Sequence, residues 1–503
     1  MRRAGWIAAL LLAGCGGDDG AAGSDTELAG STSTSGSGSE PTSGAPGSSS
    51  VGGSTSSSAD DSSSSESGGT ENPVASARLY NVTMGLPDPR WDVLPTTLST
   101  VQLPSAYTLE ALVPEDAQVV TMTLDGNETI DTTPPFLVSP DAEDGSATPL
   151  VLEPGPHTLN VMWSDGQGGE VHSEDIAFEW TTAGTAASPG PHTIHRMWRT
   201  SEGAYVMRDD AGNFVDNDGT VVFTADRVST QEQGAGQGHI LIDGSDASIV
   251  FAFIVALPDG FDPAVPYPLL VFLHHGWDVY RGTDNDGLPL DAPLFAGDRS
   301  IIADSAEHAR YPAIVLIPQM RRVHNVDGVT HEWASFTSIT DDSSNSAPEP
   351  SSNAGPVLDV VDLLEAGALP VAGQMPVIDG HRIYLAGHSM GGLGSWDLLA
   401  RMPDRWAAGV PMAGYADHER AKDVADTPIW AFHHENDCYN AASGTQAMAD
   451  MVGGAGGTRL RYTLMTFDTG GACDQAHFQT PGVAWGQEPG LFEWLFGQLN
   501  DRR

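Results

Sequence analysis

Positive charge is scarce in this chain. The 503 residues include 22 lysines and arginines against 67 aspartates and glutamates, a formal net charge of −45 at pH 7, and Lys422 is the single lysine. Nucleic-acid binding needs clustered basic side chains that meet phosphates, and recruitment to anionic lipid by charge needs a similar patch. The composition therefore argues against nucleic acid as a partner and is typical of an acidic protein kept soluble by its charge.

Long hydrophobic runs are missing as well. The first apolar stretch, Ile7 to Leu12, follows two arginines and is shorter than the roughly 20 residues that cross a bilayer. Its small residues before Cys15 are typical of a secretory signal, and Leu12-Ala13-Gly14-Cys15 resembles the lipobox of bacterial lipoproteins. We expect residues 1–15 to be a lipoprotein signal peptide, and the protein to be exported and membrane-anchored through Cys15. A plain signal peptide with an incidental cysteine is the alternative.

Large apolar residues are nearly absent from residues 16–73. This segment is almost wholly Ser, Gly, Thr, Ala, Asp and Glu, without apolar periodicity. Such a composition cannot bury enough surface to offset the entropy of ordering. We predict a disordered linker that holds the folded part away from a membrane.

Long helical periods are absent from residues 74–183. Short alternating stretches such as Val119–Leu124 and His157–Trp163 are separated by turn residues such as Asp125-Gly126-Asn127, as in hairpins. This spacing predicts a small all-β sandwich domain. The segment PGPHTLNVMWSDGQGG also resembles the closing strands of bacterial immunoglobulin-like modules. A spacer or docking role is favoured for it, since a fold does not imply a function.

Residues 184–503 show apolar runs that alternate with helical stretches. Several short strands lead up to Ile249–Leu257. Further buried strands are predicted at Leu269–Leu273, Ile314–Ile317, Ile383–Ala386, Ile429–Phe432 and Leu460–Met465, and helices at Val357–Leu364, Leu393–Met402 and Gln446–Val452. This alternation predicts an α/β fold, a mostly parallel sheet with helices on both faces. The chemistry is expected at the carboxyl ends of its strands.

A candidate nucleophile follows the strand Ile383–Ala386 directly. The sequence Gly387-His388-Ser389-Met390-Gly391 is a G-x-S-x-G elbow between a strand and a helix. Glycines are needed because a side chain at either position would collide with backbone. The amino terminus of the helix favours negative charge at Ser389, which we predict to be the catalytic nucleophile.

A serine nucleophile needs a histidine base that a carboxylate orients. In this type of site the chain order is serine, acid, histidine. Asp437 lies just past the strand Ile429–Phe432 and is favoured over Glu435. His477 is late enough in the chain to be the base, and we expect it in a loop before the final helix.

The oxyanion formed in such a reaction needs two N–H donors. Met390 supplies one by its position after the nucleophile. The other is expected from the loop after Leu269–Leu273, where the N–H of Trp277 is favoured and Gly276 allows close approach. Side chains predicted to shape the pocket are those of His275, His433, His434 and Trp333.

Cysteine is scarce too, with Cys438 and Cys473 besides Cys15. One follows Asp437 and the other precedes His477, which in an exported protein predicts a disulfide. It would clamp the acid loop to the histidine loop, whereas two buried free thiols are the alternative. No cofactor or metal is expected, because Asp216–Gly219 lacks the other ligands of a calcium loop and is interpreted as a hairpin turn.

Four blocks of the sequence resemble a known family. They are FLHHGWDVYRGTDN, IDGHRIYLAGHSMGGLGSWDLLARMPDRWAAGVPMAG, PIWAFHHENDCYN and EPGLFEWLFGQL. They are similar to α/β-hydrolase serine esterases of the peptidase/carboxylesterase family related to polyhydroxybutyrate depolymerases and feruloyl esterases. The resemblance implies the triad Ser389, Asp437 and His477, and some members carry an immunoglobulin-like module. The chain departs from the family at paired His274-His275 and at His434, where glycine is usual.

These features predict a secreted, lipid-anchored serine carboxylesterase that forms an acyl-enzyme. By resemblance its substrates are feruloyl or acetyl esters of polysaccharides. A polyester depolymerase and a serine peptidase are alternatives, the latter less favoured because the chain has no propeller repeats. The alternative of another class is a non-catalytic surface carbohydrate-binding protein, against which the complete set of catalytic groups argues.

Overall fold

A computed structural model describes most of the chain beyond residue 74. The described residues are 75–139, 146–164, 171–182, 193–232, 238–243, 245–246, 249–258, 260–276, 310–319, 333–334, 351, 353–371, 373–487 and 490–503. The predicted signal peptide with Cys15, the predicted linker and Trp277 lie outside them. Within these ranges, no helix is long and apolar enough to cross a membrane.

Residues 75–182 form two small sheets that share one core. The elements are β1 (Ser76–Asn81), β2 (Leu86–Pro87), β3 (Thr97–Ser99), η1 (Thr100–Gln102), β4 (Tyr107–Leu112), β5 (Val119–Leu124), β6 (Asn127–Asp131), β7 (Gly155–Ser164) and β8 (His172–Thr181). The sheet orders are β2-β1-β4 and β3-β8-β7-β5-β6, and both contribute to a core that contains Trp163, Phe178 and Trp180. The predicted strands β5 and β7 are confirmed, whereas an immunoglobulin-like domain stays a prediction.

Buried polar contacts join this β-rich part to the remainder of residues 71–503, which form one compact unit. The Arg90 guanidinium contacts Asp88 at 2.6 Å and Asp379 at 2.7 Å, and all three side chains are nearly buried. Asn81 Nδ2 donates to Gly497 O at 2.6 Å. Separating these groups would leave buried charges and polar atoms unpaired, which is costly.

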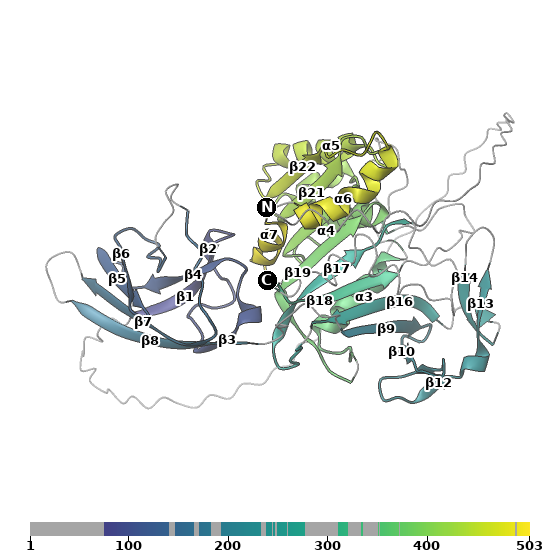
Figure 1. Ribbon diagram of the computed structural model, residues 1–503, viewed down its shortest axis with the longest axis horizontal. Coiled ribbons are helices and arrows are strands. Elements are labelled where there is room, and N and C mark those ends of the chain that lie inside the picture. The colour runs from purple at the N-terminus through teal and green to yellow at the C-terminus, as the bar shows by residue number, and fades with distance from the viewer. Residues whose placement is uncertain are drawn as a thin grey trace, which may run out of the picture. The chain divides into compact units, whose positions relative to one another are not determined.

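The remaining chain contains a large mixed sheet (Figure 1). Among the described residues it is 11-stranded, in the order β12-β11-β10-β9-β16-β18-β17-β19-β20-β21-β22. Its strands are β9 (Thr193–Thr200), β10 (Tyr205–Arg208), β11 (Phe214–Val215), β12 (Val221–Phe223), β16 (Ile249–Leu257), β17 (Pro266–Leu273), β18 (Ile314–Gln319), β19 (Val377–His388), β20 (Ala408–Met412), β21 (Ile429–His434) and β22 (Leu460–Met465). Beside it lie η2 (Ala225–Arg227) and a small sheet of β13 (Val228–Glu232), β14 (Gly238–Ile242) and β15 (Ser245–Asp246).

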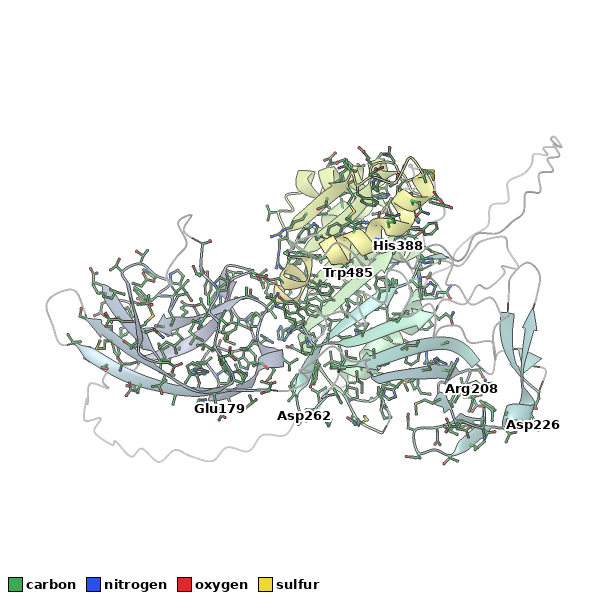
Figure 2. The ribbon with its side chains drawn as sticks, in the orientation of Figure 1. Glu179, Arg208, Asp226, Asp262, His388 and Trp485 are labelled. Atoms are coloured by element: carbon green, nitrogen blue, oxygen red, sulfur yellow. A yellow bond between two sulfur atoms is a disulfide. The ribbon has the colours of Figure 1, made fainter. Side chains whose placement is uncertain are left out.

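The large sheet has two halves of different kind. Neighbouring strands from β18 to β22 run parallel, whereas β12 to β16 and the β16–β18 pair are antiparallel. Short turns join β9 to β12 in succession, and such turns allow antiparallel pairing alone. The prediction of a mostly parallel sheet is therefore wrong for this half. Figure 2 marks the antiparallel half with Arg208 and the parallel half with His388.

Helices cover both faces of the parallel half, as predicted. One face carries α3 (Ala354–Glu365), α4 (Met390–Arg401) and α5 (Ala442–Gly454), and the other carries α6 (Cys473–Gln487) and α7 (Leu491–Gly497). In β17, Leu269 and Val271 join the first core while Leu270 and Phe272 join the second. Successive side chains of a strand point to opposite faces, so a strand that is apolar throughout is buried on both.

The central strand β20 (Ala408–Met412) was not predicted from the sequence, whereas the turn at residues 216–219 was. β20, which includes Gly409 and Pro411, lies between β19 and β21, although glycine and proline weaken a strand pattern. The predicted hairpin at residues 216–219 is confirmed, since Asp216 Oδ1 accepts the N–H groups of Asp218 and Thr220 at 3.0 and 2.9 Å. A short 3-10 helix, η5 (His418–Val424), follows β20.

Candidate active site

Ser389 lies at the turn between β19 and α4. Its backbone has φ 58° and ψ −117°, a conformation that L residues rarely adopt and that costs about 1–3 kcal/mol. Its N–H donates to Met412 O at 2.9 Å, and its C=O accepts the N–H of Leu393 at 3.0 Å. The turn is thus held by the neighbouring strand β20 and by the first turn of α4.

Two glycines allow the elbow to pack closely. A Cβ at Gly387 would lie 2.3 Å from Gly391 O, and one at Gly391 would lie 1.9 Å from Leu273 O. Both distances are far below a van der Waals contact, so no side chain fits at either position. The G-x-S-x-G spacing therefore reflects backbone packing in this chain, and that packing holds the strained serine in place.

His477 bridges the serine and the predicted acid. Its Nε2 lies 2.7 Å from Ser389 Oγ, and its Nδ1 lies 2.6 Å from Asp437 Oδ2. A carboxylate can only accept, so Nδ1–H donates to Asp437 and Nε2 is left to accept the Ser389 proton. Glu435 is exposed and plays no part in this chain of hydrogen bonds.

The structure corrects the predicted setting of His477, which lies in helix α6 and not in a loop. Pro481 lies inside this helix, and proline usually interrupts one because it lacks the N–H that would bond four residues back. That residue is His477, and its carbonyl accepts from His388 Nε2 at 3.0 Å instead. The buried elbow histidine thereby replaces the missing helical bond and fixes the backbone of His477.

Asp437 is surrounded by donors. Oδ1 accepts the N–H groups of Tyr439 at 2.8 Å and Asn440 at 3.0 Å. Oδ2 meets His477, and also His433 Nε2 at 3.2 Å. Burial raises the pKa of this carboxyl, but the hydrogen bonds of His433 and His477 outweigh burial and hold the pKa well below its usual range. These hydrogen bonds therefore favour the carboxylate form of Asp437.

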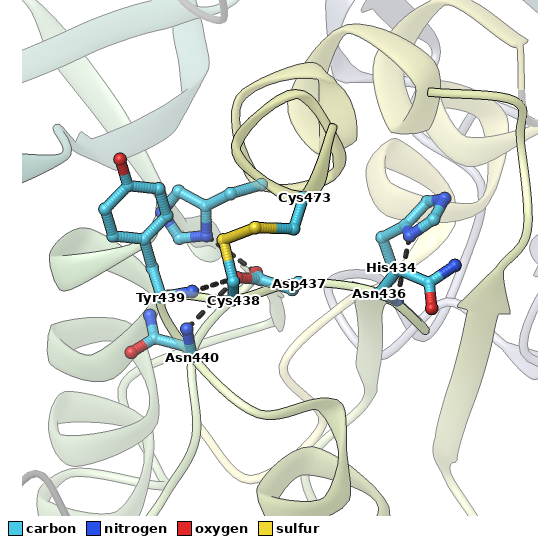
Figure 3. The surroundings of a disulfide bond; sticks show 8 residues. His434, Asn436, Asp437, Cys438, Tyr439, Asn440 and Cys473 are labelled. Atoms are coloured by element: carbon cyan, nitrogen blue, oxygen red, sulfur yellow. Dashed lines mark hydrogen bonds and ion pairs between the residues drawn. A yellow bond between two sulfur atoms is a disulfide. The ribbon is translucent and has the colours of Figure 1, made fainter. Parts of the chain in front are cut away.

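The predicted disulfide is confirmed. Cys438 and Cys473 are bonded, with a Cα–Cα distance of 5.4 Å. Figure 3 shows this bond between the residue that follows Asp437 and the first residue of α6. It ties the acid loop to the helix that carries His477, so the clamp acts on a helix end.

His434 has a different setting from the one predicted. It is buried, its Nδ1 accepts the N–H of Asn436 at 3.0 Å, and its Nε2 donates to Phe467 O at 2.9 Å. Figure 3 shows His434 and Asn436 on the far side of Asp437 from Tyr439. The imidazole links two loops, because backbone groups bond both of its nitrogens.

Trp333 is likewise a core residue, contrary to the prediction that it shapes the pocket. Its indole is fully buried among the apolar side chains beneath α4, and a Cβ at Gly394 would lie 2.4 Å from Trp333 Cβ. Its Nε1–H donates to His274 O at 3.0 Å. Trp333 therefore supports the loop after β17 from the core side.

One of the two expected oxyanion donors lies among the described residues. Met390 is the first residue of α4, so its N–H is one of those without a partner inside the helix. Gly276 lies beside it, since a Cβ at Gly276 would be 3.9 Å from the Met390 thioether. The favoured second donor, Trp277, lies outside the described residues.

Aromatic side chains surround the reactive groups. The ring of Tyr439, whose exposure is 53%, lies 4.9 Å from the ring of His477 and 5.5 Å from that of Phe478. The partly exposed His275 lies 6.0 Å from Phe478 and 5.5 Å from His388. His275 was among the side chains predicted to shape the pocket, but Tyr439 was not. In the sequence, only its position next to Cys438 points to Tyr439.

A nucleophile, a base and an orienting acid in the chain order serine, acid, histidine, with the serine on a strand–turn–helix elbow, form the layout of an α/β-hydrolase site. Solved structures similar to this chain include a thermostable esterase, 19% identical over 80% of this chain and 99% of that one, with a TM-score of 0.40. A ferulic acid esterase is 14% identical over 51% of this chain and 96% of its own, with a TM-score of 0.31.

A mutant feruloyl esterase module from Clostridium thermocellum, complexed with sinapinate, is also similar. It is 13% identical over 54% of this chain and 87% of that one, with a TM-score of 0.31. No family model matches this chain, and no curated protein matches it. The structural likenesses are distant, so the chemistry assigned to this chain rests on its own residues.

Proposed function

We propose that this protein is a serine carboxylesterase. The observation that supports this most directly is the continuous set of contacts from Ser389 Oγ through His477 to Asp437, at 2.7 and 2.6 Å. Each atom has the hydrogen-bonding role that a nucleophile, base and acid require. Ser389 and Met390 are both partly exposed, so an ester can approach the nucleophile and the N–H that follows it.

The reaction follows from this geometry in two stages. Ser389 Oγ attacks the ester carbonyl while His477 Nε2 takes its proton, and the Met390 N–H stabilises the oxyanion. The C–O bond then breaks as His477 returns the proton to the departing alcohol, which leaves an acyl-enzyme. Water, deprotonated by His477, attacks this acyl group, and the acid is released as Ser389 regains its proton. Asp437 stabilises the imidazolium formed in each stage.

The substrate proposed is an acyl ester with a planar or aromatic acid, such as a feruloyl ester of a polysaccharide. The family resemblance of the elbow and acid blocks supports this, and so does the exposed ring of Tyr439 beside His477. Flat acyl groups gain from stacking on such a ring. Acetyl esters and polyesters are the other substrates to be tested.

Export and lipid anchoring at Cys15 are also proposed. The support is the sequence alone: a positively charged start, a short apolar run and small residues before Cys15. Metabolic labelling with a radioactive fatty acid is expected to label the wild type and not Cys15→Ser. Equal labelling of both would contradict the anchor.

The test of the enzyme is hydrolysis of p-nitrophenyl acetate and butyrate by the purified protein beside Ser389→Ala. Turnover that disappears in the variant, with unchanged circular dichroism, is expected. Turnover that persists in Ser389→Ala would contradict the role of this serine. A folded wild type with no turnover of these or of feruloyl, polyester or peptide substrates would contradict a hydrolase.

A further inference from the structure

A second histidine contacts the acid of the site. His433 lies in β21, directly before its last residue His434, and is fully buried. Its Nε2 lies 3.2 Å from Asp437 Oδ2 and 2.9 Å from Asn440 O. On its other side, Nδ1 lies 2.8 Å from Thr445 Oγ1. Asp437 is therefore held between two imidazoles, of which only that of His477 reaches the serine.

The partners of His433 define what its nitrogens do. Asn440 O and the Asp437 carboxylate are acceptors, so Nε2 must carry a hydrogen. The Thr445 hydroxyl, which donates to Gly414 O at 2.6 Å, meets Nδ1 and holds the ring from its other side.

We propose that His433 is a positioning residue whose Nε2–H holds the catalytic carboxylate from the side opposite His477; this rests on the proposed function. The side chains of His433 and Asp437 are both fully buried, and a buried carboxylate needs such hydrogen-bond donors. His433 also connects the acid loop to the elbow, because Gly414 lies against the first turn of α4. A Cβ at Gly414 would be 2.6 Å from the carbonyl carbon of Gly392.

The contact of His433 has a consequence for the base. A carboxylate fixed in place keeps Asp437 Oδ2 aligned with His477 Nδ1, so His477 stays in the orientation that accepts the Ser389 proton. Asp437 contacts His433 directly, and His477 lies beyond it on the same carboxylate oxygen. The contact of His433 with α5 is through Thr445, which does not titrate.

The test compares His433→Gln, His433→Leu and the neighbouring control His434→Gln in the full chain. Glutamine can place an N–H₂ near the position of Nε2 and so keeps the donor, whereas leucine has none. We expect His433→Gln to keep kcat within about threefold, because its amide can still hold the Asp437 carboxylate. His433→Leu is expected to lower kcat about 10- to 100-fold with little change in KM.

His434→Gln is expected to leave kcat and KM unchanged, because the hydrogen bonds of His434 run to Phe467 and Asn436. A His433→Leu variant with the kcat of the wild type, or a His433→Gln variant as slow as His433→Leu, would overturn the proposal. A readout that needs no activity separates this failure from failure of the proposed function. In ¹⁵N-histidine NMR spectra, assigned by the signal lost in His433→Gln, a protonated Nε2 is expected, and a lone-pair Nε2 would overturn the proposal.

Discussion

The nucleophile elbow and the acid loop hold their reactive groups by different means. At the elbow, Ser389 is fixed by backbone atoms that approach so closely that Gly387 and Gly391 cannot be replaced. In the acid loop, Asp437 is fixed by four hydrogen-bond donors and by a neighbouring disulfide. The elbow is thus held by steric exclusion, and the acid loop by hydrogen bonds, mostly from its own residues, together with His477 and a covalent bond to α6.

The acid loop should show the largest effect when its carboxylate is lost. Asp437→Asn keeps the shape of the side chain but removes the charge that orients and stabilises protonated His477. We expect kcat for p-nitrophenyl butyrate to fall about 10⁴-fold. Glu435→Gln is the matched control, since Glu435 is exposed, and an equal loss in that variant would contradict the assignment of the acid.

Removing the covalent part of the acid loop should cost stability. The bond between Cys438 and Cys473 spans a sequence separation of 35. A cross-link over such a loop restricts the unfolded chain by about 3–4 kcal/mol in the chain-entropy model. The Cys438→Ser, Cys473→Ser double variant is expected to unfold at lower denaturant by about this amount. An unchanged midpoint, with the bond shown to be intact in the wild type, would contradict the clamp.

Adding one methyl group at Gly391 should test whether close backbone contacts hold the elbow. Gly391→Ala places a Cβ 1.9 Å from Leu273 O, so strand β17 or the elbow must shift, at a cost of about 3 kcal/mol. Gly453→Ala is the control, because a Cβ there meets nothing within 4 Å. We expect only the Gly391 variant to lose stability and activity, as measured by urea unfolding and ester hydrolysis.

Lowering the pH should reduce the stability that Asp437 gives to the fold, by a smaller amount than the changes above. The pKa of Asp437 is lower in the folded protein than in the unfolded chain, so its ionisation stabilises the fold above the unfolded value of about 3.9. This stabilisation is lost as the pH falls below that value toward the folded pKa. Melting temperatures of the wild type and Asp437→Asn should therefore converge on acidification, and a constant difference down to pH 3 would contradict the shift.

The same comparison explains what the sequence could predict. The strand–glycine–serine–glycine–helix pattern is local, so residues 383–402 reveal the elbow, and the long apolar strands reveal the parallel half of the sheet. Asp437 and His477 followed from chain order. The role of His433 did not, because its contact with Asp437 and the Thr445 hydroxyl at its other nitrogen depend on how the acid loop folds against α5.

Proline and glycine weaken the local pattern in two places. Pro481 is locally unfavourable in the helix that carries His477, but His388, from a distant part of the chain, bonds the carbonyl that the proline leaves without its helical partner. Gly409 and Pro411 hid β20, which is buried on both sides between β19 and β21. In both cases tertiary contacts outweighed a local preference that the sequence alone displays.

The central claim is that Ser389 is a nucleophile activated by His477. Reaction with a fluorophosphonate, followed by intact-mass and peptide mass spectrometry, tests it most directly because the adduct stays on the attacking oxygen. The account predicts one adduct per chain, located on Ser389, absent from Ser389→Ala and formed much more slowly in His477→Ala. An adduct on another residue, or no adduct in a protein that hydrolyses esters, would contradict it.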